Sequence, residues 1–200
     1  PRRLMECGVR STVSYTLINL YHLSGHRGNT MNKWGNNMEI TQELVRELYD
    51  YRDDGKLIHK MARKGAKVGT EAGWLCSKGY CQVSVLGKLG LSHRIIFLYH
   101  HGYLPKMVDH INGVRTDNRI ENLRECTMSQ NKANSKGTAV SGYKGVRKRG
   151  RKWYVNIKVN SKAIWLGAYD NIETAAQVAA AAREHYFGEF ANHGHIAEGV

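Results

Sequence analysis

The most constraining feature of this sequence is a polar stretch in its middle, where an Asp-His pair is followed, one residue later, by an Asn-Gly pair. The stretch consists of Val108-Asp109-His110-Ile111-Asn112-Gly113, then Asp117-Asn118-Arg119-Ile120-Glu121-Asn122-Leu123-Arg124, then Ser129-Gln130-Asn131. Because Asn-Gly is a strong signal for a tight turn, Asn112-Gly113 predicts a β-hairpin that carries His110 near its tip.

The residue types in this stretch suit the hydrolysis of a phosphodiester bond. That reaction requires a base that activates water, a cation that offsets negative charge, and groups that hold both in place. Histidine is the side chain that titrates near neutral pH, so His110 fits the base. Asp109 and Asn131 offer a carboxylate and an amide oxygen, which are ligands for Mg²⁺ or Mn²⁺. Singly, such residues are more often surface hydrogen bonds or turns, and Asp117 and Asn118 are expected to bond to their own loop.

Residues from about 41 to 134 resemble the phage-type HNH endonucleases, many of which are homing enzymes, and the resemblance rests on the whole spacing of this stretch. The family fold is a β-hairpin and a helix around one divalent cation, the ββα-metal motif. By position, the resemblance implies that His110 is the general base, that Asn122 braces the loop and orients His110, and that Asp109 and Asn131 are the metal ligands. Many relatives have His in place of Asn131, so we expect a Mg²⁺ site rather than zinc, with Mn²⁺ as an alternative.

The resemblance also includes His93-Arg94, which precedes an apolar segment that predicts a helix as far as His101, closed by Gly102. We expect His93 to pack or hydrogen-bond near the site rather than to act in catalysis. Upstream, Thr41 is the predicted N-cap of a helix that ends before the turn Asp53-Asp54-Gly55.

The composition points to a polyanionic partner and away from membranes. The chain has 30 Lys and Arg against 17 Asp and Glu, a formal net charge of +13, and nucleic acid usually relieves such an excess. A charge that serves only solubility is the alternative. No apolar run is long enough to span a bilayer, and four cysteines without a CxxC pair are expected to be reduced thiols. We therefore expect a cytoplasmic protein, in a bacterial host if it is phage-encoded, that binds double-stranded DNA and has no implied protein partner.

The C-terminal part has the pattern of a small sheet followed by a helix. Three short strands and an Ala-rich helix are predicted at Tyr143–Arg149, Lys152–Val159, Ala163–Tyr169 and Ile172–Phe187. Strand alternation places Arg147 and Arg149 on one face and Val146 on the other. Positive charge therefore gathers on one side of the predicted sheet.

Residues from roughly 141 to 193 resemble the AP2 DNA-binding domain in the Gly145-Val146-Arg147 opening, the Leu166-Gly167-Ala168-Tyr169-Asp170 turn and the Ala-rich helix. In that family the sheet lies in the major groove and the helix packs on its back face. The resemblance implies DNA contacts from Lys144, Arg147, Arg149, Lys152, Asn156, Lys158 and Trp165. Arginine reads guanine edges, whereas lysine contacts are mostly to phosphates. Ala163 replaces an arginine of the plant-type domains, so their base preference is not carried over, and Trp153 is expected to be core.

Together these patterns predict an α+β protein with an HNH nuclease domain of the ββα-metal type at residues 38–131. A linker at 132–142 and a small AP2-like domain at 143–193, with a three-stranded antiparallel sheet and one helix, are expected to follow. Residues 1–37 are expected to be a peripheral extension, disordered or foreign to the natural protein, and 194–200 a tail. The predicted function is metal-dependent DNA cleavage by a homing-type enzyme whose AP2-like domain binds the target. The alternatives are a non-catalytic AP2-type transcriptional regulator and an RNA-binding protein, the latter disfavoured because the strands show no aromatic stacking signature.

Overall fold

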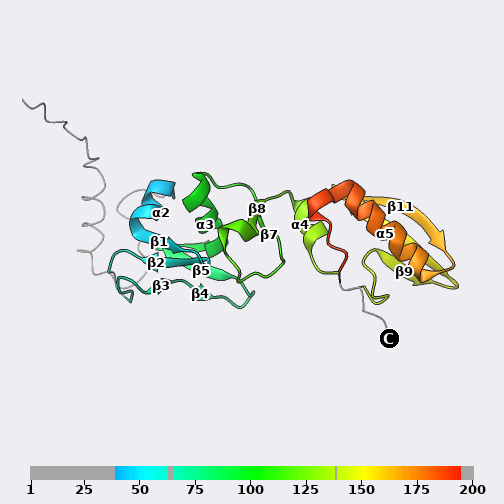
Figure 1. The fold of residues 1–200 in the computed structure, drawn as a ribbon, viewed down its shortest axis with the longest axis horizontal. Helices are drawn as coiled ribbons and strands as arrows, with labels where there is room; N and C mark the ends of the chain where they lie inside the picture. Colours follow the sequence, from blue (N-terminus) through cyan, green and yellow to red (C-terminus); the bar gives the residue numbers. More distant parts are fainter. Residues whose placement is uncertain (1–38, 63–64, 138, 195–200) are drawn as a thin grey trace, which may run out of the picture.

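The computed structural model describes residues 39–62, 65–137 and 139–194, so the predictions for residues 1–37 and for most of the tail lie outside the described residues. Within these ranges the chain forms four α-helices and four small sheets. The elements of residues 42–125 lie at one end of a long axis and those of residues 146–190 at the other, with residues 128–134 between them (Figure 1). None of the described helices is long and apolar enough to cross a membrane.

The N-terminal unit, residues 39–134, begins with two helices and two antiparallel sheets. Its first elements are α2 (Gln42–Leu48), β1 (Tyr49–Arg52), β2 (Lys56–His59), β3 (Glu71–Ala72), β4 (Trp74–Leu75), β5 (Cys81–Val85), β6 (Lys88–Leu91) and α3 (Ser92–His101). The strands form the sheets β1-β2-β3 and β4-β5-β6. Helices and sheets share one apolar core, in which Val45, Tyr49 and Ile96 are fully buried.

The first helix is shorter than predicted. The Thr41 side chain caps it as expected, but the helix ends at Leu48, and the following residues form β1 instead of continuing it. This strand pairs with β2 across a turn at Gly55, whose φ of +84° is readily adopted only by glycine. Tyrosine favours strands, and the pairing buries Tyr49 completely, so tertiary contacts override the helical pattern.

Helix α3 follows its prediction and carries His93 into the interior. It ends at Gly102, which adopts a left-handed φ of +79° and donates its N–H to the Leu98 carbonyl. The helix buries Ile95, Ile96 and the neighbouring His93, which is only 4% exposed. Packing of the apolar face of this helix therefore holds His93, in the first turn, in the interior.

A two-stranded sheet and a helix complete the N-terminal unit. Strands β7 (Val108–His110) and β8 (Leu123–Glu125) pair antiparallel, with Asp109 opposite Arg124. The predicted turn is present, because Gly113 has a φ of +69° and donates its N–H to the His110 carbonyl. The connection nevertheless runs through residues 111–122 and includes the short helix η1 (Ile120–Asn122), so the hairpin has a long loop rather than a tight one.

Helix α4 (Met128–Asn134) follows β8 and extends into the predicted linker. Thr127 and Gln130 form a capping box at its start, in which each side chain bonds the other residue's backbone N–H. This cap fixes where the helix begins, and Ala133 and Asn134 at its end are buried. The residues that begin the predicted linker, 132–134, are therefore helical.

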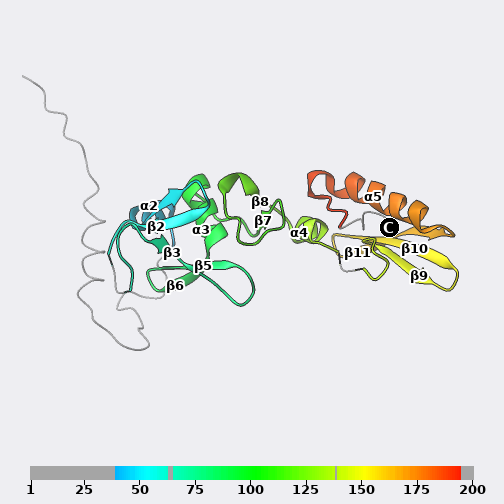
Figure 2. The same cartoon turned by 60° about the horizontal axis from the view of Figure 1, so that its bottom comes forward.

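The C-terminal unit, residues 139–194, is a sheet of order β11-β10-β9 with a helix on one face (Figure 2). Its elements are β9 (Val146–Arg149), β10 (Lys152–Val159), β11 (Lys162–Tyr169), α5 (Ile172–Phe187) and the short η2 (Gly188–Phe190). Alanines allow the close packing of helix on sheet, because Ala175 and Ala179 are buried against Val146 and Val155. The predicted order of three strands and a helix is present, with the helix at its predicted bounds.

Candidate active site

Asp109 and His110 lie side by side on β7, and both side chains are buried, at 6% and 5% exposure. Consecutive strand residues point to opposite faces. The contacts agree, since Asp109 bonds residues of β8 and α4, whereas the His110 ring packs against His93 of α3. The strand thus presents a carboxylate and an imidazole in two distinct environments only one residue apart.

One oxygen of the Asp109 carboxylate accepts all of its hydrogen bonds from the described residues. Its Oδ2 accepts hydrogen bonds from Asn134 Nδ2 at 2.8 Å and from Nε and Nη2 of Arg124, each at 3.3 Å. Within the described part of the chain, no hydrogen bond ends on Oδ1. One carboxylate oxygen is therefore fixed in position while the other is left for a further partner.

The His110 imidazole is held by Asn118. Nε2 of His110 lies 3.0 Å from Asn118 Oδ1, and an amide oxygen only accepts, so Nε2 carries the proton of the neutral ring. Nδ1 is then the nitrogen with a free lone pair, which is the form a general base needs. Asn118 is 3% exposed, and its contact with His110 corrects the expectation that it bonds its own loop.

The Asn122 side chain bonds atoms of its own loop rather than His110. Its Nδ2 donates to Asn112 Oδ1 at 3.0 Å and to the Asp117 carbonyl at 2.7 Å, and its Oδ1 accepts from Asn112 N–H at 3.0 Å. Asp117 in turn bonds Arg119 and Asn112, and the Arg119 hydrogen bonds hold the pKa of its carboxyl well below the usual range. These hydrogen bonds join residues within the loop that carries Asn118.

His93 packs edge-on against His110, with ring centroids 4.8 Å apart. Burial, and secondarily the proximity of His110, lowers the pKa of His93 to about 3, so its ring is neutral at neutral pH. Its Nδ1 has no hydrogen-bond partner among the described residues. The contact is the packing role expected for this residue near the site.

The two asparagines of α4 have different partners. Asn131, the predicted second metal ligand, has its Nδ2 3.1 Å from the Met107 sulfur. Asn134, one turn later, reaches the site itself and bonds Asp109 Oδ2 and the His110 carbonyl, both at 2.8 Å. Sequence reasoning missed Asn134, because both lie in the same polar helix and nothing in the pattern distinguishes them.

The donor set around Asp109 suits a hard cation with few protein ligands. No group of three or more His, Cys, Asp or Glu side chains in the described ranges is arranged to hold a metal. Mg²⁺ commonly takes one or two carboxylates and leaves its other positions to water and substrate phosphates. The unengaged Oδ1 of Asp109 fits that pattern.

Most of the predicted DNA-contacting residues share the face of the sheet opposite α5. Cross-strand partners lie on the same face, and the register pairs Arg147 with Tyr154, Arg149 with Lys152, Asn156 with Trp165, and Lys158 with Ala163. Val146 and Val155 face the helix instead. Trp165 is 57% exposed and its ring lies 5.3 Å from that of Tyr154. The face thus carries an aromatic pair among its cations.

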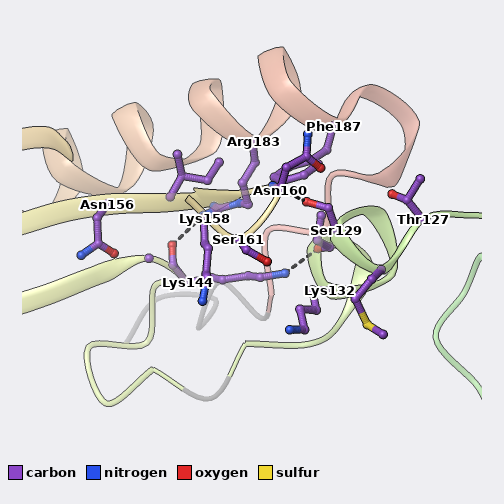
Figure 3. Close-up of a pocket in the computed structure, with 14 residues that line it drawn as sticks. Thr127, Ser129, Lys132, Lys144, Asn156, Lys158, Asn160, Ser161, Arg183 and Phe187 are labelled. Atoms are coloured by element: carbon purple, nitrogen blue, oxygen red, sulfur yellow. Dashed lines mark hydrogen bonds between the residues drawn. The ribbon is translucent and has the colours of Figure 1, made fainter. Parts of the chain in front are cut away.

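Lys144 departs from the predicted set. Its ammonium donates to the carbonyls of Ala133, Ser135 and Asn192 at 2.5, 2.6 and 3.2 Å, so the side chain reaches α4 rather than the exposed face (Figure 3). Burial, with the nearby Arg183 guanidinium, lowers the pKa of Lys144 to about 8. This lysine thus joins the two units through backbone carbonyls.

A pocket of about 420 Å³ lies at the same junction, between α4 and the C-terminal unit (Figure 3). Its lining includes Lys132, Lys158 and Ser129, and Ser129 Oγ accepts a hydrogen bond from the Asn160 N–H at 3.0 Å. The pocket's two most buried cations, Lys144 and Arg183, already bond backbone carbonyls.

Residues 91–133 match the family model of HNH endonucleases. The match supports a nuclease of the HNH type. It spans α3, both strands of the β7–β8 pair, the loop between them and almost all of α4, which are the elements that surround Asp109 and His110. Neither a curated protein nor a solved structure matches the chain.

Proposed function

We propose that this protein is a metal-dependent DNA endonuclease in which His110 is the general base and Asp109, with Asn131, holds Mg²⁺ or Mn²⁺. The observation that carries the proposal is the pair on β7: an imidazole fixed through Nε2 beside a carboxylate fixed through Oδ2. Both groups keep one atom without a hydrogen bond from described residues. The HNH match over the same elements supports the choice of phosphodiester hydrolysis.

In the proposed reaction, Nδ1 of His110 accepts a proton from the attacking water. Asn118 keeps the proton of the resting ring on Nε2, so that Nδ1 stays a base, and Asn122 holds the loop that carries Asn118. A divalent cation beside Asp109 would offset negative charge on the phosphate and on the leaving oxygen. Arg124 and Asn134 keep the carboxylate directed at that position.

For the C-terminal unit we propose AP2-like binding of the target duplex. The exposed face opposite α5 offers Arg147 and Arg149 for base edges and Lys152 and Lys158 for phosphates, with Asn156 and Trp165 beside them. A homing role in a phage or mobile element, acting in the bacterial cytoplasm, accords with a nuclease that carries its own targeting surface. Sequencing the cleavage sites on phage and host genomes tests that role, because a homing enzyme cuts at one or a few sites.

The direct test of the nuclease is plasmid nicking in Mg²⁺. Loss of a general base typically costs about 10²–10⁴-fold in rate, so His110→Ala is expected to lose cleavage to that extent, as should wild type in EDTA. His185→Ala, an exposed histidine on α5, is the matched control and should cleave as wild type does.

Equal cleavage by wild type and His110→Ala would overturn the base assignment. If neither cleaves while duplex DNA is bound, the protein is a DNA-binding regulator instead. Preference for RNA over duplex DNA in a competition assay would point to an RNA-directed protein.

A further inference from the structure

We propose that the C-terminal unit holds the Asp109 carboxylate in place, so that it positions the nuclease site in addition to binding DNA. The inference rests on the proposed function, because it concerns the carboxylate assigned to the cation. Two chains of contacts carry it. Each runs from the last described residues of the C-terminal unit to Asp109.

The first chain passes through Arg124. Its guanidinium carbon lies 3.6 Å from the centroid of the Phe190 ring, and Nη1 donates to the Glu189 carbonyl at 3.1 Å. Its remaining nitrogens, Nε and Nη2, reach Asp109 Oδ2 at 3.3 Å. The Arg124 and Asp109 side chains are only 12% and 7% exposed. The η2 segment therefore fixes the plane of the guanidinium, and the guanidinium fixes the carboxylate.

The second chain passes through the end of α4. Asn192 donates from Nδ2 to the Asn134 carbonyl at 2.9 Å, and Asn134 donates to Asp109 Oδ2 at 2.8 Å. Lys144 secures the same place, because its ammonium binds carbonyls of Ala133 and of Asn192. Displacing the C-terminal unit would thus remove a partner from each of the two residues that hold Asp109.

An apolar cluster makes this junction firm. Phe187 and Phe190 of the C-terminal unit are buried together with Cys126 and Ala133 of the N-terminal unit. A shared buried core restricts movement between units, whereas the predicted linker implied two modules on a tether. The contacts to Asp109 are therefore built into a packed interface.

Changes in η2 are therefore expected to alter the affinity for the divalent cation. Residues that hold a metal ligand typically contribute about 10–100-fold to metal affinity. Phe190→Leu keeps an apolar side chain in the cluster but removes the ring on which Arg124 lies. We expect it to raise the Kd for Mn²⁺ about 10-fold and to lower kcat, while affinity for duplex DNA in EDTA stays unchanged. Tyr186→Leu removes an exposed aromatic ring from the same unit and should leave all three quantities as in wild type.

The experiment is titration calorimetry of the full chain with Mn²⁺ in the absence of DNA. Asp109→Ala gives the reference without the proposed site, and thermal unfolding checks each variant. Asn192→Ala interrupts the second chain without touching the cluster, so it decides the matter if Phe190→Leu fails to fold. Weaker Mn²⁺ binding by Asn192→Ala or Phe190→Leu, with unchanged DNA affinity, supports the inference.

Mn²⁺ affinities equal to wild type in both variants would overturn the inference and leave the nuclease proposal standing. If wild type itself neither binds Mn²⁺ nor cleaves DNA, the proposed function falls, and the positioning role falls with it.

Discussion

The β7 site and the exposed face of the C-terminal sheet use similar polar side chains in opposite surroundings. Asp109, His110, Asn118 and Asn122 are all almost completely buried, and each has a specific hydrogen-bond partner. The sheet face instead leaves Trp165 57% exposed among several cations. Buried polar groups need hydrogen-bond partners, which restrict the side chains of the β7 site, whereas the exposed charges of the sheet face are screened by salt. Chemistry and binding should therefore respond to different changes.

The largest difference between the effect on cleavage and the effect on DNA binding is expected from Asn118→Ala. This change leaves the His110 Nε2 proton without its acceptor and frees the ring to adopt the other tautomer, so cleavage should fall about 100-fold. DNA affinity should not change, because the sheet face is untouched. Steady-state nicking rates and fluorescence anisotropy on the same duplex provide the two measurements. A change in KM alone would show that Asn118 acts on binding instead.

A second comparison, within the site, is between Asn131 and Asn134. Asn134→Asp would place a second carboxylate 2.8 Å from Asp109 Oδ2, and we expect this like charge to perturb the proposed ligand and weaken Mn²⁺ binding about 10-fold. Asn131→Asp would add a carboxylate at the proposed ligand position and should retain or strengthen binding. Calorimetry with both variants checks the difference. The reverse ranking would transfer the ligand role to Asn134.

The buried site should also make stability depend on pH. The folded-state pKa of His93 is about 3, below the ordinary value near 6.5, so unfolding takes up a proton between these values. Its contribution to stability is present above pH 6.5 and is lost as pH falls, at up to about 1.4 kcal/mol per pH unit. Urea unfolding between pH 7 and pH 4 measures the slope. His93→Gln should flatten it, and His185→Gln, on an exposed helix position, should not.

The smallest effect is expected on the sheet face, from Lys158→Ala. Loss of one phosphate contact lowers the salt dependence by about one ion, which changes the affinity ratio between 50 and 200 mM salt about fourfold. Lys88→Ala, on a strand of the N-terminal unit, provides a lysine control away from this face. Anisotropy at several salt concentrations gives both slopes. An unchanged slope for Lys158→Ala would remove it from the proposed interface.

Periodic segments were predictable because their signals are local. Helix α5 and the alternation of Arg147, Val146 and Arg149 follow from short-range patterns, and the structure retains them. The segment after Leu48 was predicted wrongly as helix, because its pairing with β2 depends on residues further along the chain. Lys144 was assigned to DNA from its place in the motif, yet its partners lie on α4 and near the C-terminus.

The sequence by itself determined that Asp109 and His110 are neighbours, that an Asn-Gly turn follows them, and that a polar helix comes next. It could not determine which of several asparagines bonds Asp109 and which bonds His110. Asn118 rather than Asn122 contacts His110, and Asn134 rather than Asn131 contacts Asp109. Loops and short polar helices have no apolar periodicity that fixes their phase against a partner. Their hydrogen-bond partners are decided only by the tertiary structure, in which β7, β8, α4 and the C-terminal unit pack around one site.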